Sequence, residues 1–265
     1  MSFQALRLVS NLLAIGLYGR SSPRALAAAF KICGRRLERR WPYLPKAVGK
    51  DLNLEFGDLL EFQFARSRDF TALIVGAFDG VANDLAGEFV RANECKAVFV
   101  EPQPGPFQRL CEVMRGNPRV ELVNAAIDRK AGLRNFYSVP GGIAGMPDWA
   151  ERLGSFDREH VLKHESRAPG LSRHIVTTTV RTLSFNDVLD RHGLRKLDLV
   201  QIDAEGMDAA LLEWFPFEQI KPALLHYEVA HMSLCEHSAI TMRLRGMGYR
   251  IFPNESATDD MAVLF

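Results

Sequence analysis

The sequence lacks a long hydrophobic run. Its apolar stretch at residues 12–17 is bracketed closely by Arg7 and Arg20. It falls far short of the roughly 20 apolar residues that cross a bilayer. No clear small-residue cleavage site follows it, which disfavours a signal peptide. The sequence therefore predicts no membrane-spanning helix.

Cysteine is scarce, and an excess of one charge is lacking. The cysteines show no C-x-x-C spacing, which favours free thiols of a reducing compartment over a disulfide framework or a zinc site. They are Cys33, Cys95, Cys111 and Cys235. Across 265 residues, 33 basic side chains stand against 32 acidic ones. This balance gives no argument for a nucleic-acid partner.

A local excess of basic residues does occur at the N-terminus. Residues 1–48 are rich in Lys and Arg and hold one acid, Glu38. Loose helical periodicity favours a helical extension, residues 1–50, packed on a domain of residues 51–265. A basic amphipathic contact with an anionic membrane surface or a partner is the alternative. We expect a cytoplasmic protein, and this alternative would place it at the inner membrane surface.

Two phosphate-binding motifs are also missing. No Gly-Lys-Ser/Thr follows the loop Gly76-Ala77-Phe78-Asp79-Gly80, so the loop is not a Walker A motif. Phe78 stands where the dinucleotide fingerprint G-x-G-x-x-G requires its second glycine. These absences argue against nucleoside triphosphates and NAD.

What the sequence does contain is an alternation of apolar strands and amphipathic helices from Thr71 onward. Residues 56–64 form a short strand or helix leading into it. We expect strands at 72–76, 96–101, 120–125, 134–138, 174–182, 197–203, 222–229, 249–253 and 260–265, and helices at 81–93, 104–115, 183–192, 206–215 and 235–247. Repeated βα units predict an α/β fold with helices on both faces of a parallel sheet. The polar turn at 253–260 predicts an antiparallel pair at the end.

Polar and small residues stand where the first strands end. Glu101 ends the second strand, where an acid is well placed to accept hydrogen bonds from both hydroxyls of a ribose. Asn124-Ala125-Ala126 end the third strand, where small residues would let an adenine ring lie flat. Without a pyrophosphate loop, these features favour S-adenosylmethionine as the ligand. A solvated acid and a tightly packed strand end are the alternatives.

Two acids follow the apolar strand in LDLVQIDAEG, residues 197–206. Asp203 and Glu205 lie at a strand end in the expected ligand crevice, where carboxylates are costly unless they are functional or paired. Capping of the following helix is the alternative, and it is favourable with the helix dipole.

These segments together resemble the FkbM-type methyltransferase family. The resemblance is carried by IVGAFDG (74–80), VFVEPQPGPFQRL (98–110), VELVNAAIDRKAG (120–132), TTTVRTLSFNDVL (177–189) and LDLVQIDAEGMDAALL (197–212). It implies a class I methyltransferase-like (Rossmann-like) fold, with a seven-stranded, mostly parallel sheet that ends in an antiparallel hairpin. The family often has Asn near the acid of the glycine loop, so Ala77-Phe78-Asp79 is a variant.

The resemblance also implies roles for these residues. The loop of Gly76, Ala77, Phe78, Asp79 and Gly80 would pack beside the methionine part of S-adenosylmethionine. Glu101, followed by Pro102, would hold the ribose, and Asn124, Ala125 and Ala126 would line the adenine pocket. Ser155 would contact the cofactor or the acceptor. Asp203 and Glu205 would meet the methyl group and the acceptor, one of them as the base or orienting carboxylate.

The expected strand at 222–229 adds two further candidates, Glu228 and His231, near its carboxyl end. His231 is a candidate base because imidazole titrates near neutrality; a solvated loop histidine is the alternative. Asp203, Glu228 and His231 could orient a hydroxyl through magnesium, but no specific spacing supports this, and we predict no metal site. His160 and His164 are spaced i, i+4 without an H-E-x-x-H motif, and we interpret them as surface polar residues.

The long segment 140–172 has no clear periodicity, and segments of this length are usually functional or disordered. We expect it to cover the acceptor side as an insertion or lid. Trp149, Phe156, His160 and His164 would form a sugar-stacking wall or anchor the lid. Family members are thought to methylate hydroxyls of sugars or polyketides. The predicted function is O-methylation of a sugar hydroxyl; the alternatives are a polyketide, lipid or protein acceptor, or a non-catalytic membrane-docked scaffold.

Overall fold

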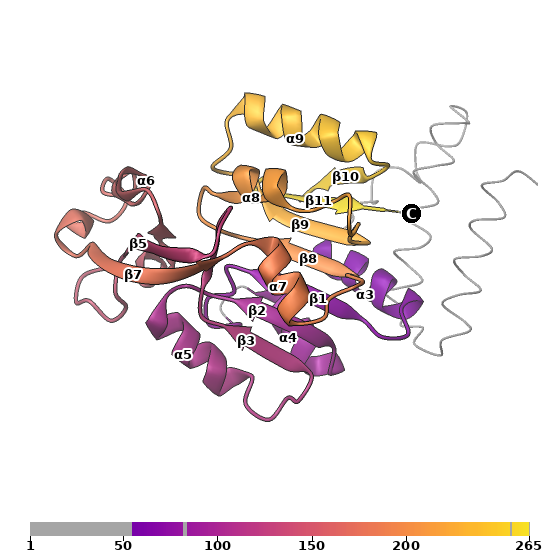
Figure 1. Ribbon diagram of the computed structural model, residues 1–265. Coiled ribbons are helices and arrows are strands. Elements are labelled where there is room, and N and C mark those ends of the chain that lie inside the picture. Colours follow the sequence, from indigo (N-terminus) through magenta and orange to yellow (C-terminus); the bar gives the residue numbers. More distant parts are fainter. Residues whose placement is uncertain (1–54, 82–83, 255, 265) are drawn as a thin grey trace, which may run out of the picture.

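The computed structural model describes residues 55–81, 84–254 and 256–264. Its larger sheet has seven strands in the spatial order β10-β11-β9-β8-β1-β2-β3 (Figure 1). The strands are β10 (Arg250–Pro253), β11 (Asp259–Val263), β9 (Leu224–Glu228), β8 (Leu199–Ile202), β1 (Thr71–Val75), β2 (Lys96–Val100) and β3 (Val120–Val123).

The strand directions confirm the predicted fold class. Five neighbouring strands of this sheet run parallel to one another, in the spatial order β3, β2, β1, β8 and β9. The strand β11 is antiparallel to both β9 and β10. The order reverses at β1, with β2 on one side and β8 on the other, and such a switch point opens a crevice at the carboxyl ends of the strands. This is the class I methyltransferase arrangement.

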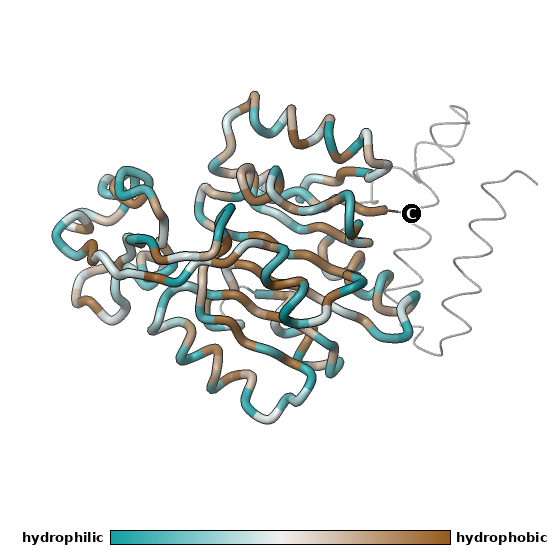
Figure 2. Tube along the Cα trace, viewed as in Figure 1, coloured by the Kyte–Doolittle hydropathy of each residue, from teal (hydrophilic) through white to brown (hydrophobic). Residues whose placement is uncertain are grey.

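Within the described residues, six helices cover the two faces of the larger sheet. On one face α3, α4 and α5 pack against Ala72, Ile74 and Phe99. On the other face α7, α8 and α9 pack against Leu73, Val200 and related residues. The helices are α3 (Phe56–Arg66), α4 (Leu85–Asn93), α5 (Pro104–Val113), α7 (Phe185–Arg191), α8 (Asp208–Trp214) and α9 (Leu234–Gly246). Figure 2 shows hydrophobic colour concentrated along the central strands, which are buried on both faces.

Two local expectations change at the start of the domain. The segment at 56–64, expected as a strand or a helix, is the helix α3. The helix expected from residue 81 begins at Leu85, with Asp84 in the N-cap position. The N-terminal extension and the domain boundary near residue 50 lie outside the described residues. Within the described part of the chain, none of the helices is long and apolar enough to cross a membrane.

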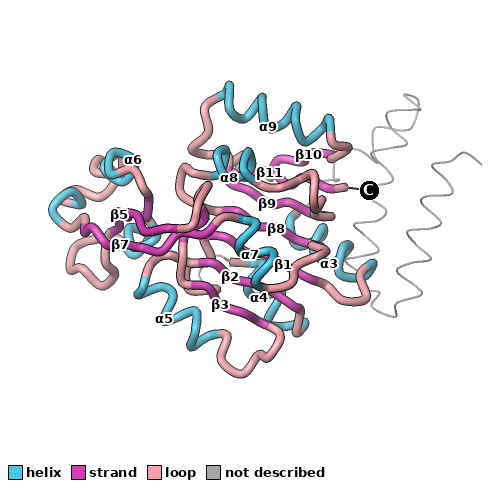
Figure 3. Tube along the Cα trace, viewed as in Figure 1, coloured by secondary structure: helices cyan, strands magenta, loops and turns pink. Residues whose placement is uncertain are grey.

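A second sheet was not expected. It has four strands in the order β4-β7-β5-β6, and it carries the segments expected as strands 134–138 and 174–182. Its strands are β4 (Ala126–Ile127), β7 (Val176–Leu183), β5 (Gly132–Ser138) and β6 (Gly154–Ser155). The strands β5 and β7 pair antiparallel along the whole length of β5 and extend away from the main sheet (Figure 3).

The segment 140–172 lies on this second sheet. It contains two short 3-10 helices, η2 (Asp148–Arg152) and η3 (Leu171–Arg173), and one short α-helix, α6 (Arg158–Leu162). Val139, Leu153, Val161 and Leu171 are buried together in a small hydrophobic core of their own. The segment is therefore a folded unit beside the carboxyl ends of the main strands.

Candidate active site

Three predicted residues meet where parallel strands end. Val75 of β1 is in register with Val100 of β2 and with Ile202 of β8. The next residues along the three strands are Gly76, Glu101 and Asp203. Strand pairing therefore brings the glycine turn and the two acids to one edge of the sheet.

The turn after β1 requires glycine at position 76. The backbone N–H groups of Gly76 and Ala77 both donate to the carbonyl of Val100, at 3.0 and 3.2 Å. Gly76 has φ of 76°, and a Cβ there would lie 1.6 Å from the carbonyl oxygen of Asp203. The ends of β1 and β8 therefore approach too closely for any side chain at this position.

Glu101 joins the loops that follow β1 and β2. Its carboxylate accepts hydrogen bonds from the backbone N–H of Phe78 at 2.9 Å and of Gln103 at 2.7 Å. Burial raises the pKa of Glu101 to about 8, against the opposing effects of these N–H groups and of Arg109. Each carboxylate oxygen has two lone pairs, so acceptor capacity remains for a ligand.

A cavity of about 930 Å³, counted with its open mouth, lies at this edge of the sheet. Most of the residues that the sequence placed in the site line it. They are Gly76, Ala77, Phe78, Glu101, Pro102, Ala125, Ala126, Ser155, Asp203 and Glu205. The second sheet and its insertion close one side through Phe136, Arg152 and Phe156.

Three predicted residues lie behind the cavity wall. The Asn124 side-chain amide donates to the carbonyls of Glu101 at 2.8 Å and Pro102 at 3.2 Å. Asp79 accepts from the backbone N–H of Val81 at 3.0 Å. A Cβ at Gly80 would lie 2.7 Å from Leu110. These residues shape the loops, and direct cofactor contact by them stays a prediction.

Sequence reasoning missed a polar chain beneath the cavity. Gln201, in the middle of β8, donates from its side-chain nitrogen to Asp84 at 3.1 Å, and its oxygen lies 3.3 Å from Nδ1 of His226. Both Asp84 and Gln201 line the cavity, and burial raises the pKa of Asp84. The sequence does contain a signal for this polar chain, namely a glutamine inside the otherwise apolar strand LVQI.

The predicted catalytic residues form one charged group. Asp203 and Glu205 line the cavity, while Nε2 of His231 lies 3.6 Å from Glu205 and 3.7 Å from Glu228. Partial desolvation, then the carboxylates of Glu205 and Glu228, raise the pKa of Asp203 above its ordinary value, while the residue keeps contact with solvent. Glu205 therefore lies in the cavity wall, and Glu228 and His231 lie next to it but outside the wall.

Charge coupling shifts the pKa of Glu228 and of His231. Burial, then the charge of Glu205, raises the pKa of Glu228 to about 7. The Glu205 carboxylate raises the pKa of His231. Glu205 also has φ of 46°, a backbone strain that non-glycine residues carry mostly at functional sites. The three side chains thus form one electrostatically linked group beside the cavity.

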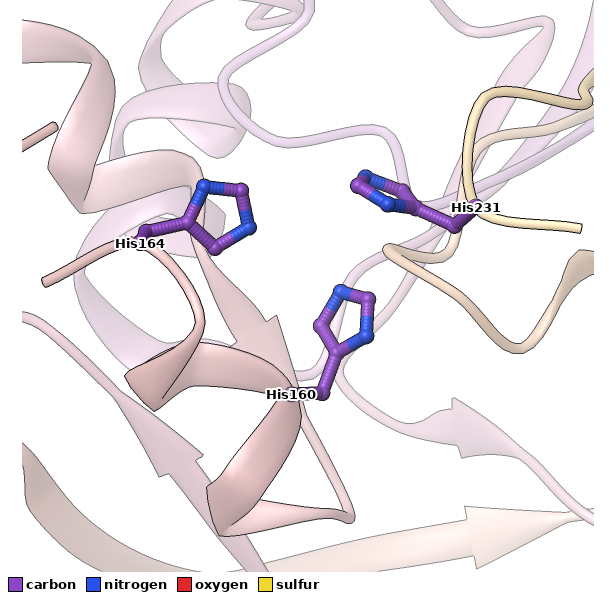
Figure 4. Close-up of side chains that lie close together, drawn as sticks. All are labelled: His160, His164 and His231. Carbon is purple, nitrogen blue, oxygen red and sulfur yellow. The ribbon is translucent and has the colours of Figure 1, made fainter. Parts of the chain in front are cut away.

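The interpretation of His160 and His164 as surface residues is wrong. Both are 8% exposed. The ring centroids of His160 and His231 are 4.7 Å apart, and those of His164 and His231 are 5.9 Å apart (Figure 4). The insertion therefore delivers two histidines to the charged group, a placement that the helical spacing alone could not reveal.

The family model of the methyltransferase FkbM domain matches residues 75–251. The chain belongs to the FkbM methyltransferase family. The predicted resemblance is thereby confirmed. The match begins at the end of β1 and includes the whole charged group.

Solved structures similar to this FkbM chain include other methyltransferases. An FkbM methyltransferase from Methylobacillus flagellatus KT is 12% identical with a TM-score of 0.46, covering 97% of this chain and 60% of that one. A putative O-methyltransferase from Klebsiella pneumoniae is 12% identical with a TM-score of 0.37, covering 92% and 90%. A precorrin-6y C5,15-methyltransferase from Geobacter metallireducens GS-15 is 12% identical with a TM-score of 0.39, covering 82% and 92%. No curated protein matches the sequence.

Proposed function

We propose that this chain is an S-adenosylmethionine-dependent O-methyltransferase whose acceptor is a sugar hydroxyl. One observation carries the proposal. The buried Glu101 and the Gly76 turn form one end of a cavity in which Asp203 and Glu205 form another part of the wall. An adenosine-binding acid and a pair of carboxylates therefore share one enclosed space.

The cavity wall fits the proposed cofactor. Glu101 offers its remaining lone pairs to the two ribose hydroxyls. Ala125 and Ala126 are small and buried in the wall, so a flat purine ring can lie against the backbone there. The Gly76 turn lets the chain approach the methionine part. The bound cofactor would supply an electrophilic methyl group on its sulfonium.

The chain's own part in the transfer is to orient the acceptor and remove its proton. Asp203, with its raised pKa, holds a proton more readily than an ordinary carboxyl and suits hydrogen bonding to the acceptor. Glu205 lines the cavity, and Nε2 of His231 lies 3.6 Å from its carboxylate and helps to hold it in place. We assign Glu205 as the base and His231 as the residue that supports it.

The acceptor end of the cavity suits a carbohydrate. Phe156 lines it, and an aromatic face packs well on the C–H surface of a sugar ring. Gln103, Ser155 and Arg152 add polar groups to the same wall. This combination supports a sugar over a wholly apolar lipid or polyketide acceptor.

A labelled methyl-donor assay on a panel of sugars, polyketides, lipids and proteins tests the acceptor. We expect sugars to be methylated and Glu205→Gln to lower kcat by about 100-fold or more, the range for loss of a general base. The control is Glu213→Gln, at an exposed position of α8, and it should leave kcat unchanged. S-adenosylhomocysteine should bind both variants.

Other outcomes of this assay would overturn the proposal. Methylation of another acceptor class would disprove the sugar. No calorimetric binding of S-adenosylhomocysteine by the folded chain would disprove the cofactor. Binding without transfer, unaltered by changes at Asp203 and Glu205, would indicate a non-catalytic scaffold.

The affinity for S-adenosylhomocysteine should rise with pH. Ribose hydroxyls donate to the ionised form of Glu101, whose pKa is about 8 before binding. Below that pH the carboxyl must lose its proton to bind, so the affinity should increase from pH 6 to pH 8 by up to about tenfold per unit and then level off.

Calorimetric titration in two buffers with different ionisation enthalpies measures this proton release directly. The control, Glu101→Gln, cannot ionise and should lose the part of the pH dependence that Glu101 supplies. An affinity that is flat across this range in the unaltered protein would contradict the assignment.

A further inference from the structure

Five side chains converge where the insertion meets the main sheet. His160 and His164 come from the insertion, Glu228 and His231 from the end of β9, and Glu205 from the loop after β8. The ligand atoms of the three histidines (Figure 4) lie within 4.8 Å of one another. The ligand atoms of Glu205, Glu228 and His231 are equally close to one another. His231 belongs to both groups.

The two insertion histidines are buried with unused nitrogen atoms. Nε2 of His160 and Nδ1 of His164 have no hydrogen-bond partner among the described residues, and neither has Oε2 of Glu228. Each histidine is 8% exposed. Buried polar atoms without partners are rare in proteins because each costs free energy. This cluster therefore calls for a ligand that accepts electron pairs.

The protonation state of the two insertion histidines suits such a ligand, whereas His231, whose pKa Glu205 raises, would release its proton on binding an ion. Burial lowers the pKa of His160 and of His164. Neutral imidazoles keep a lone pair on one ring nitrogen, which is the form that binds metals. The two carboxylates of Glu205 and Glu228 offer two negative charges to balance a divalent cation.

We propose that His160, His164 and His231, with the carboxylate of Glu228, bind one divalent transition-metal ion of the Zn²⁺ or Co²⁺ type. Three imidazoles favour such ions over Mg²⁺ and Ca²⁺, which prefer all-oxygen sites. Metal–nitrogen bonds of about 2.0–2.1 Å place neighbouring donor atoms about 3.0–3.4 Å apart. Small side-chain rotations would bring the donor atoms of the three histidines, which now lie within 4.8 Å of one another, to this separation around an ion.

The absence of a side chain at Gly206 leaves space for the His160 ring. A Cβ at this position would lie 2.5 Å from Cε1 of the His160 ring, and Gly206 has φ of 88°. The glycine of the IDAEG segment thus lets the His160 ring lie over the loop that carries Glu205. The ion would link the insertion to the main sheet directly beside the cavity.

Metal binding by the full-length protein tests the inference without reference to methyl transfer. The protein is dialysed against a chelator and titrated with Zn²⁺, Co²⁺ and Mg²⁺ by calorimetry, and Co²⁺ binding is followed by its visible absorption. We expect one Zn²⁺ or Co²⁺ per chain and no comparable binding of Mg²⁺. His164→Gln should lower the Zn²⁺ affinity by roughly tenfold or more.

His174→Gln is the matched control, because His174 lies in the same region but outside the cluster. It should bind Zn²⁺ like the unaltered protein. His231→Gln is the second test, in case the buried His164 variant does not fold, and circular dichroism checks each metal-free variant. Absence of Zn²⁺ and Co²⁺ binding, or equal binding by the cluster variants and the control, would overturn the site. Failure to bind S-adenosylhomocysteine would bear only on the proposed function.

Discussion

Replacing Gly76 by alanine is expected to lower the free energy of unfolding by about 3 kcal/mol or more. Two costs combine at this position. The backbone has φ of 76°, and the new Cβ would lie 1.6 Å from the carbonyl oxygen of Asp203. The carbonyl cannot move without separating the ends of β1 and β8. Urea unfolding followed by circular dichroism measures the loss.

Gly142 provides a matched control for Gly76. It has nearly the same backbone conformation, with φ of 75°, and a Cβ there would meet nothing within 4 Å. Gly142→Ala should therefore lower the free energy of unfolding only by the cost of backbone strain, about 1 kcal/mol. If the two substitutions lowered the free energy of unfolding by the same amount, the close approach of the strand ends would not be the reason for glycine at position 76.

Glu101→Ala is expected to weaken S-adenosylhomocysteine binding by at least about 100-fold. The variant loses the acceptor for the ribose hydroxyls, and the N–H groups of Phe78 and Gln103 lose their common partner. Hydrogen bonds to a charged group contribute about 1.5–3 kcal/mol each, and a factor of 100 corresponds to about 2.7 kcal/mol. Calorimetric titration of the folded variant gives the affinity.

Glu165 separates the two effects of removing Glu101. Its carboxylate also accepts from two backbone N–H groups, those of Gly170 at 2.8 Å and Ser172 at 2.7 Å, but it does not line the cavity. Glu165→Ala should disturb a loop to a similar degree and leave the affinity for S-adenosylhomocysteine unchanged. A similar loss of affinity in both variants would show that Glu101 acts only as a loop brace.

The central part of the fold was predictable because its signals are local. Each parallel strand is a short apolar run, and the residue after it must lie at the carboxyl edge of the sheet. Gly76, Glu101 and Asp203 therefore meet as the sequence predicted. The family motifs lie in the same segments, so pattern and resemblance led to the same cavity.

The second sheet was not predictable in the same way. Its main pair joins β5 to β7, with the whole insertion between them in the chain, and pairing between such distant segments leaves no local mark on the sequence. The burial of His160 and His164 likewise depends on Gly206 and on the end of β9. The i, i+4 spacing predicted only that the two histidines lie one helical turn apart, and it did not indicate whether they face solvent or the protein interior.

The small hydrophobic core around Val139, Leu153 and Val161 has a consequence for how this enzyme family can diversify. The insertion buries its own apolar residues in this small core, apart from the two cores that cover the main sheet. Substitutions in its loops can therefore change the part of the cavity wall that the insertion supplies and leave the Gly76 turn and Glu101 in place. If the proposed function holds, selectivity for the acceptor can change in this way without loss of the cofactor site.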